Sequence, residues 1–265
     1  MGIAMSVSNI LTVVSAYILR SYLRYEGGIE EVGIFSAGYA IINTYVNMIF
    51  TAMSTDFYPR LAAVNRDNAK CRDIVNQQGE IGTLIIAPML MCCITFMPIL
   101  INLLYSEKFV AANDYVLFAA VGMMFRFASV LVAHLFLAKG SAKIYMQNEA
   151  AVCIYTLALN LAGFHYLGLK GLGISFMLSY LLYLIQVLWQ SRKYYDFYFS
   201  KSFTSLYVFH LLMVLLCLCT FLFTTGALSY CIGIPFCVVS IVSAIIGLDK
   251  RIKLIETVKS RFFRL

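Results

Sequence analysis

The residues Tyr115–Ala138, YVLFAAVGMMFRFASVLVAHLFLA, indicate most clearly which fold class this chain belongs to. These 24 residues contain one charged side chain, Arg126, near the middle. As a helix rising about 1.5 Å per residue, the stretch would cross the roughly 30 Å hydrocarbon core of a membrane. Lipid offers the backbone no hydrogen-bond partners, and the sequence lacks the strict alternation of a barrel strand. The stretch therefore predicts a transmembrane helix.

Similar apolar stretches occupy most of the remaining chain. The composition is 62% hydrophobic and 12% charged, with a mean hydropathy of +0.84, whereas charged residues make up about a quarter of soluble domains. We therefore predict an all-α, polytopic transmembrane helix bundle of about eight spans. Besides Tyr115–Ala138, the expected spans are Gly2–Tyr22, Val32–Ser54, Ile81–Tyr105, Glu149–Tyr166, Leu172–Trp189, Ser205–Gly226 and Leu228–Leu248.

Lysine and arginine gather at alternate ends of these spans. Basic residues near span ends resist translocation and stay in the cytoplasm, so both termini are predicted to be cytoplasmic. This asymmetry accounts for the net charge of +7 and leaves no basic stripe for nucleic acid. One face carries Arg60, Arg66, Lys70, Arg72, Lys139, Lys143, Arg192, Lys193, Lys201, Lys250, Arg251, Lys253, Lys259, Arg261 and Arg264; the other carries Arg20, Arg24, Lys108 and Lys170.

The connections between spans are short. The longest, Thr55–Glu80, contains the polar run Asn65–Gln78, which predicts either an amphipathic cytoplasmic helix or a loop. Pro59 is expected to end the second span. Gly168 and its neighbours predict a tight hairpin between the fifth and sixth spans. The tail, Asp249–Leu265, mixes apolar residues with six cations and is expected to lie on an anionic inner leaflet.

Cysteine and histidine residues are dispersed along the chain. Seven of the eight cysteines lie in apolar spans, where cysteine behaves as a small hydrophobe. The three histidines fall in different spans, and the sequence contains no Cys-x-x-Cys pair. We therefore expect neither a metal site, nor a cofactor, nor catalytic residues.

Arg126 is the side chain that is most expensive to place in a membrane. A cation at mid-span costs about 2.5–3.5 kcal/mol on insertion scales, and about a dozen helical residues separate it from either interface. It needs a partner or a wet cavity. One interpretation is an ion pair with Glu149 or Asp114; the other is a cation that binds phosphate in a central cleft.

Asparagines in other spans are the next candidates. Asn43 and Asn47 lie one helical turn apart and share a face, and Asn9 and Asn160 are also intramembrane amides. Such amides either hydrogen-bond neighbouring helices or contact a polar substrate such as sugar hydroxyls. With Arg126 and Arg20, they form the candidate set of substrate-binding residues.

Several short motifs carry a family resemblance. The chain resembles the C-terminal lobe of bacterial oligosaccharide flippases of the multidrug/oligosaccharidyl-lipid/polysaccharide exporter superfamily. The matching motifs are EVGIFSAGY at Glu31–Tyr39, FYPRLA at Phe57–Ala62, Ala87-Pro88, LYSEKF at Leu104–Phe109, LAKG at Leu137–Gly140 and GLKGLG at Gly168–Gly173.

The resemblance implies a six-helix lobe (residues 1–190), an additional helix pair (191–248) and the basic tail (249–265). Members of this family have two such lobes facing each other across a cleft, so this sequence is expected to be either a fragment of a longer protein or a half that must pair. We expect its partner to be the missing N-terminal lobe or a second half-transporter. The resemblance implies a location in the bacterial inner membrane among membrane lipids. It also implies translocation of undecaprenyl-diphosphate-linked oligosaccharide for surface polysaccharide such as the O-antigen of lipopolysaccharide.

Two other functions remain open. A cation-coupled multidrug exporter of the same superfamily would need a mid-span carboxylate, whereas Glu149 is placed at the cytoplasmic start of its span. A membrane polysaccharide polymerase or acyltransferase would need catalytic clusters on a substantial loop, and the predicted connections are too short for one.

Overall fold

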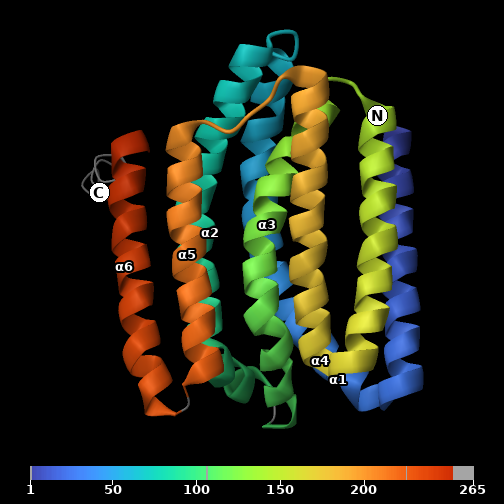
Figure 1. The fold of residues 1–265 in the computed structure, drawn as a ribbon, viewed down its shortest axis with the longest axis vertical. Coiled ribbons are helices and arrows are strands. Elements are labelled where there is room, and N and C mark those ends of the chain that lie inside the picture. The colour runs from blue at the N-terminus through green and yellow to red at the C-terminus, as the bar shows by residue number, and fades with distance from the viewer. Residues whose placement is uncertain (1, 106, 225, 253–265) are drawn as a thin grey trace, which may run out of the picture.

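The computed structural model describes residues 2–105, 107–224 and 226–252, and within these ranges the chain is a bundle of helices without strands (Figure 1). The all-α membrane bundle is therefore confirmed. Six helices in the described part are long and apolar enough to cross a membrane. The elements are α1 (Gly2–Ala63), α2 (Asn68–Leu104), the 3-10 helix η1 (Glu107–Ala111), α3 (Ala112–Ala138), α4 (Ala142–Tyr195), α5 (Lys201–Phe223) and α6 (Ala227–Ile252).

Two of these helices are bent back on themselves at a glycine. Helix α1 has 62 residues and α4 has 54, which at about 1.5 Å per residue would overreach a 30 Å core more than twofold if straight. Gly28 (φ 83°, ψ 178°) and Gly168 (φ 59°, ψ −141°) adopt backbone angles that side chains disfavour. Each helix reverses direction there (Figure 1), so the described chain crosses eight times, and the predicted hairpin at Gly168 is confirmed.

Helix α3 is the centre of the bundle. In its most apolar window 78% of the residues are buried, because α1, α2, α4 and α5 all contact it. Glycine permits the closest approach: a Cβ added at Gly173 of α4 would lie 2.5 Å from the carbonyl oxygen of Tyr115. Small residues commonly bring transmembrane helices this close.

The second arm of α1 extends past Pro59, so the expectation that proline ends this helix was wrong. Proline removes one backbone donor, but other contacts hold the following turn in place. Arg60 bonds Asp56 at 3.0 Å and Gln77 of α2 at 3.0 Å, and Leu61 is completely buried. Helix α2 then begins after the N-cap Asp67, so the polar run of the long connection is helical from Asn68 onward and forms a turn before it.

A five-residue segment, 196–200, connects α4 to α5 across one end of the bundle (Figure 1). We call it the strap. Phe197 is 3% exposed and its ring lies 5.3 Å from that of Phe199. The Asn76 side chain accepts a hydrogen bond from the Ser200 amide at 2.8 Å, and Arg72 lies 4.3 Å from the Tyr198 ring centroid. The strap is thus fixed to α2.

Helices α5 and α6 form a peripheral pair against α2. Arg251 of α6 bonds Glu80 of α2 at 2.7 Å, and deeper in the bundle the Thr95 hydroxyl lies 3.2 Å from the Cys237 sulfur. The C-terminal end of α6 and the start of α1 lie at the same end of the bundle, on opposite sides of it (Figure 1); that this end is cytoplasmic stays a prediction. Most of the predicted basic tail falls at 253–265, outside the described residues.

Candidate functional site

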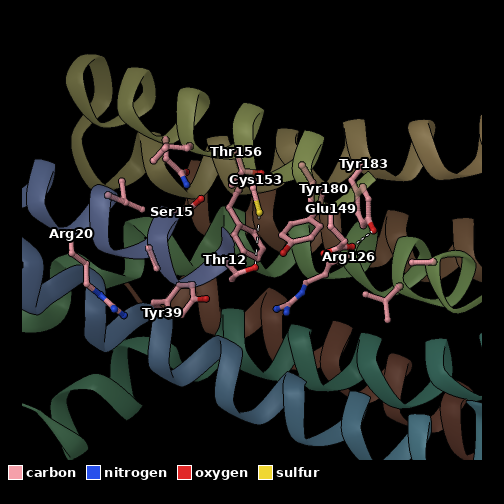
Figure 2. Close-up of a pocket in the computed structure, with 18 of the residues that line it drawn as sticks. Thr12, Ser15, Arg20, Tyr39, Arg126, Glu149, Cys153, Thr156, Tyr180 and Tyr183 are labelled. Carbon is pink, nitrogen blue, oxygen red and sulfur yellow. Dashed lines mark hydrogen bonds between the residues drawn. The ribbon is translucent and has the colours of Figure 1, made fainter. Parts of the chain in front are cut away.

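A cavity of about 360 Å³ lies between α1, α3 and α4, within the 300–1,000 Å³ typical of ligand pockets. Both arms of α1 and both arms of α4 contribute to it, so the two glycine bends bring its walls together. Figure 2 shows Arg20, Ser15 and Tyr39 toward one end and Arg126, Glu149 and Tyr183 toward the other.

Arg126 projects from the middle of α3 into this cavity (Figure 2). Its Nη1 donates a hydrogen bond to Asn43 Oδ1 at 2.8 Å. The guanidinium carbon lies 5.5 Å from the Tyr180 ring centroid and 5.6 Å from that of Phe50, which is within the range of cation–π attraction. These contacts offset part of the cost of a cation inside the membrane.

The ion pair considered for Arg126 is not formed. Among the described residues, the ion pairs are Arg60–Asp56, Lys70–Asp67, His165–Glu26 and Arg251–Glu80. The Arg126 charge is therefore partnered by a neutral amide and aromatic rings. A guanidinium in this state retains donors for an anionic ligand such as phosphate.

Glu149 also lines the cavity, and the sequence interpretation misplaced it. Helix α4 begins at Ala142, about two turns before Glu149, so its carboxylate lies inside the bundle rather than at its edge. Tyr183 donates to Oε1 at 2.6 Å and Ser8 donates to Oε2 at 3.0 Å. This local network satisfies the carboxylate without Arg126.

The remaining wall combines hydroxyl groups with aromatic rings. Thr12, Ser15 and Thr156 contribute hydroxyls, and Tyr39 and Tyr180 contribute rings (Figure 2). Sequence reasoning missed these residues, because tyrosine and threonine are common in membrane spans and nothing in the pattern indicates which helix faces meet. Only the inward faces of α1 and α4, fixed by the two bends, distinguish them.

The predicted substrate-binding residues divide into two groups. Arg126, Arg20 and Asn160 line the cavity, and Asn43 is 4% exposed and bonds Arg126 directly. Asn9 is exposed and Asn47 is half-buried, and neither lines the cavity. The structure thus brings four of the six candidates to one place.

The first comparison with known proteins is by sequence. The model of a family described as "Polysaccharide biosynthesis protein" matches residues 1–114. The lipid III flippases of Escherichia coli (strain K12) and of Shigella flexneri are each 25% identical over 198 residues, which is 71% of this chain and 46% of the relative. The chain thus spans about half the length of these curated relatives.

The second comparison with known proteins is by structure. The lipid II flippase MurJ, in an inward closed conformation, superposes with a TM-score of 0.62 over 93% of this chain and 51% of its own, at 15% sequence identity. The superposition shows that the two chains share a fold, and by sequence the chain is similar to polysaccharide biosynthesis proteins and to lipid III flippases.

Proposed function

We propose that the chain is one lobe of a flippase that carries a polyprenyl-diphosphate-linked oligosaccharide from the cytoplasmic to the outer leaflet of a bacterial inner membrane. The observation that supports this most is Arg126, a mid-membrane cation without an acidic partner among the described residues, facing a cavity. A diphosphate is the ligand whose charge such a guanidinium complements. Surface polysaccharides such as O-antigen are the end products that we infer.

The physical task of such a transporter is to shield a polar head group. A charged diphosphate and its sugars cannot cross hydrocarbon unaided, whereas the lipid tail can stay in the bilayer. A polar cavity near the membrane centre supplies the shielding, and alternate opening of two lobes would move the head group. An inside-negative potential favours outward movement of each uncompensated negative charge by about 2.3 kcal/mol per 100 mV.

We infer that the second lobe is supplied by a further polypeptide segment or a second copy. The match covers 46% of each curated relative, and the cavity is walled here by three helices of this chain. Both termini should then be cytoplasmic. Accessibility labelling tests this orientation: cysteines near Lys70 should react from inside the cell and those near Glu30 from outside.

The decisive experiment replaces Arg126 in the complete transporter. Arg126→Ala should abolish surface polysaccharide while membrane levels of the folded protein persist, and Arg126→Lys should restore part of it, because the charge returns without the bidentate geometry. Arg24→Ala, a cation exposed on α1 that does not line the cavity, is the matched control. Normal export by the alanine variant would remove Arg126 from the mechanism.

A cation-coupled drug exporter is the second candidate, favoured by the position of Glu149 in the cavity. A carboxylate there could take a proton, a metal cation or a cationic drug. Glu149→Gln separates the two functions. Loss of drug resistance with normal surface polysaccharide would favour the exporter, and the reverse pattern would favour the flippase.

A further inference from the structure

We propose that the part of the cavity around Tyr39 is a glycan subsite, separate from the cation at Arg126, where the Tyr39 ring stacks on a sugar and Thr156 and Asn160 bond its hydroxyls. This inference rests on the proposed flippase function and specifies how the head group is held. It assigns the diphosphate and the first sugar to different side chains of one cavity.

Unpartnered polar groups are the first observation. The Thr156 hydroxyl is buried without a hydrogen-bond partner in the described residues, and so is that of Tyr115. The Asn160 amide lines the same cavity and makes no hydrogen bond to a described residue. Buried polar groups are normally bonded, so groups left without partners beside a cavity favour a ligand that carries hydroxyls.

An open aromatic ring is the second observation. Tyr39 is 36% exposed and lines the cavity. Its ring lies 5.6 Å from that of Phe35, which contacts Tyr115 edge-on at 5.2 Å, and Tyr115 in turn contacts Phe176. The ring is therefore supported by aromatic neighbours on α1, α3 and α4. The electron-rich face of such a ring suits the apolar C–H face of a pyranose.

The spacing between the two parts is the third observation. The carbonyl oxygen of Tyr39 accepts a hydrogen bond from Asn43 Nδ2 at 3.1 Å, while Asn43 Oδ1 accepts the bond from Arg126. Tyr39 and Asn43 are four residues apart, about one helical turn and about 6 Å along α1. In a polyprenyl-diphosphate sugar the first pyranose is bonded directly to the diphosphate, so a ring one turn from the phosphate-binding cation lies at a suitable distance.

The two regions are distinct in the close-up. Figure 2 shows Tyr39, Ser15 and Arg20 displaced from Arg126 and Glu149 along the cavity. Arg20 forms no ion pair with a described residue. The Tyr39 region thus combines an aromatic ring and a hydroxyl with the cation Arg20, whereas the other region holds Arg126 and Glu149.

Two probes test the subsite in the full chain reconstituted in lipid nanodiscs. Farnesyl diphosphate presents the diphosphate alone, and farnesyl-diphosphate-N-acetylglucosamine adds one sugar. We expect the added sugar to lower the Kd about tenfold in the unaltered chain, because one or two well-placed polar and ring contacts can supply that much affinity. In Tyr39→Leu and Thr156→Val the gain should fall below about threefold, with binding of farnesyl diphosphate unchanged.

Matched variants separate recognition from folding. Tyr39→Phe retains the ring and should keep most of the gain, and Tyr25→Leu, at a residue 91% exposed outside the cavity, should keep all of it. Circular dichroism melting checks that each variant is folded. Arg126→Ala should weaken both probes.

Each outcome decides between the two proposals. If farnesyl diphosphate binds through Arg126 but the sugar adds no affinity, water alone fills the Tyr39 region and the subsite is overturned while the proposed function stands. If Tyr39→Leu weakens both probes equally, Tyr39 only supports Asn43 and the subsite is again overturned. If neither probe binds, both proposals fail.

Discussion

Helices α3 and α6 are both strongly apolar, yet α3 is mostly buried in the bundle and α6 is mostly exposed. The most apolar window of α3 has a mean hydropathy of 2.1 and is 78% buried, whereas that of α6 has a higher value, 2.5, and is 22% buried. The more hydrophobic helix is the more exposed one. In a membrane, lipid tails are as apolar as a leucine side chain, so hydropathy does not decide which helix is packed inside.

Backbone proximity distinguishes the two helices better than hydropathy does. Where α3 meets α4, a Cβ at Gly173 would collide with a backbone oxygen, while at Gly247 of α6 the nearest atoms belong to the Leu84 side chain. Close packing of backbones fixes the central helices, and adaptable side-chain contacts hold the peripheral pair. The helices packed closely around α3 thus position Arg126.

The largest expected effect comes from adding one methyl group at these two glycines. Gly173→Ala should destabilise the bundle by about 1–3 kcal/mol, because the Tyr115 carbonyl at 2.5 Å cannot move without shifting α3. Gly247→Ala should leave stability unchanged or raise it by up to about 1 kcal/mol, since alanine favours helix and Leu84 can change rotamer. Thermal melting in detergent measures both. Equal losses would erase the distinction between core and periphery.

A smaller effect is expected where the peripheral pair is tied to α2. Glu80 and Arg251 are 17% and 24% exposed, so Arg251→Ala leaves a largely buried carboxylate without its partner, at a cost of roughly 1 kcal/mol. Hydrogen exchange should quicken in α6 and stay slow in α3. Lys250→Ala, on the neighbouring exposed position, is the control. A loss of protection throughout the bundle would show that α6 is integral to the core.

The smallest effect concerns two helix caps and the pH. Asp67 Oδ1 accepts bonds from the amides of Lys70 and Ala69 at the start of α2, and the bond from Lys70 in particular lowers the pKa of this carboxyl below its usual 3.8. Ser200 caps α5 with a hydroxyl that does not titrate.

The lowered pKa fixes the sign of the pH dependence. The Asp67 cap contributes fully above the pKa of the unfolded chain and is lost as the pH falls through the lower, folded value. Hydrogen exchange in the first turn of α2 should therefore increase in acid relative to that in the first turn of α5. Asp67→Asn, which keeps an acceptor but not the charge, should remove the difference. A pH response that persists in the asparagine variant would assign it to another group.

The transmembrane segments were predictable because each one depends on a single continuous run of residues. Runs of about twenty apolar residues indicate membrane-spanning helices, and the glycine at 168 indicates a bend. The inference that Arg126 needs a wet or bonded environment also followed from its position alone. These features depend on one segment at a time.

The cavity wall was not predictable, because it depends on which faces of separate helices meet. Glu149 was misplaced when its helix was taken to start at that residue, and the helix beyond Pro59 was missed because contacts from α2 outweigh one lost hydrogen bond. Tyr39 gave no signal among 18 tyrosines. Long-range packing, rather than local propensity, decided each of these.

The strap at 196–200 determines how the peripheral pair takes part in any motion. A loose linker would let α5 and α6 drift in the bilayer, but the buried Phe197 and the bond between Asn76 and Ser200 hold this one against α2. We therefore expect a rotation of the helices around α3 to be transmitted to α5. If those helices tilt during transport, α5 should tilt with them as part of one body.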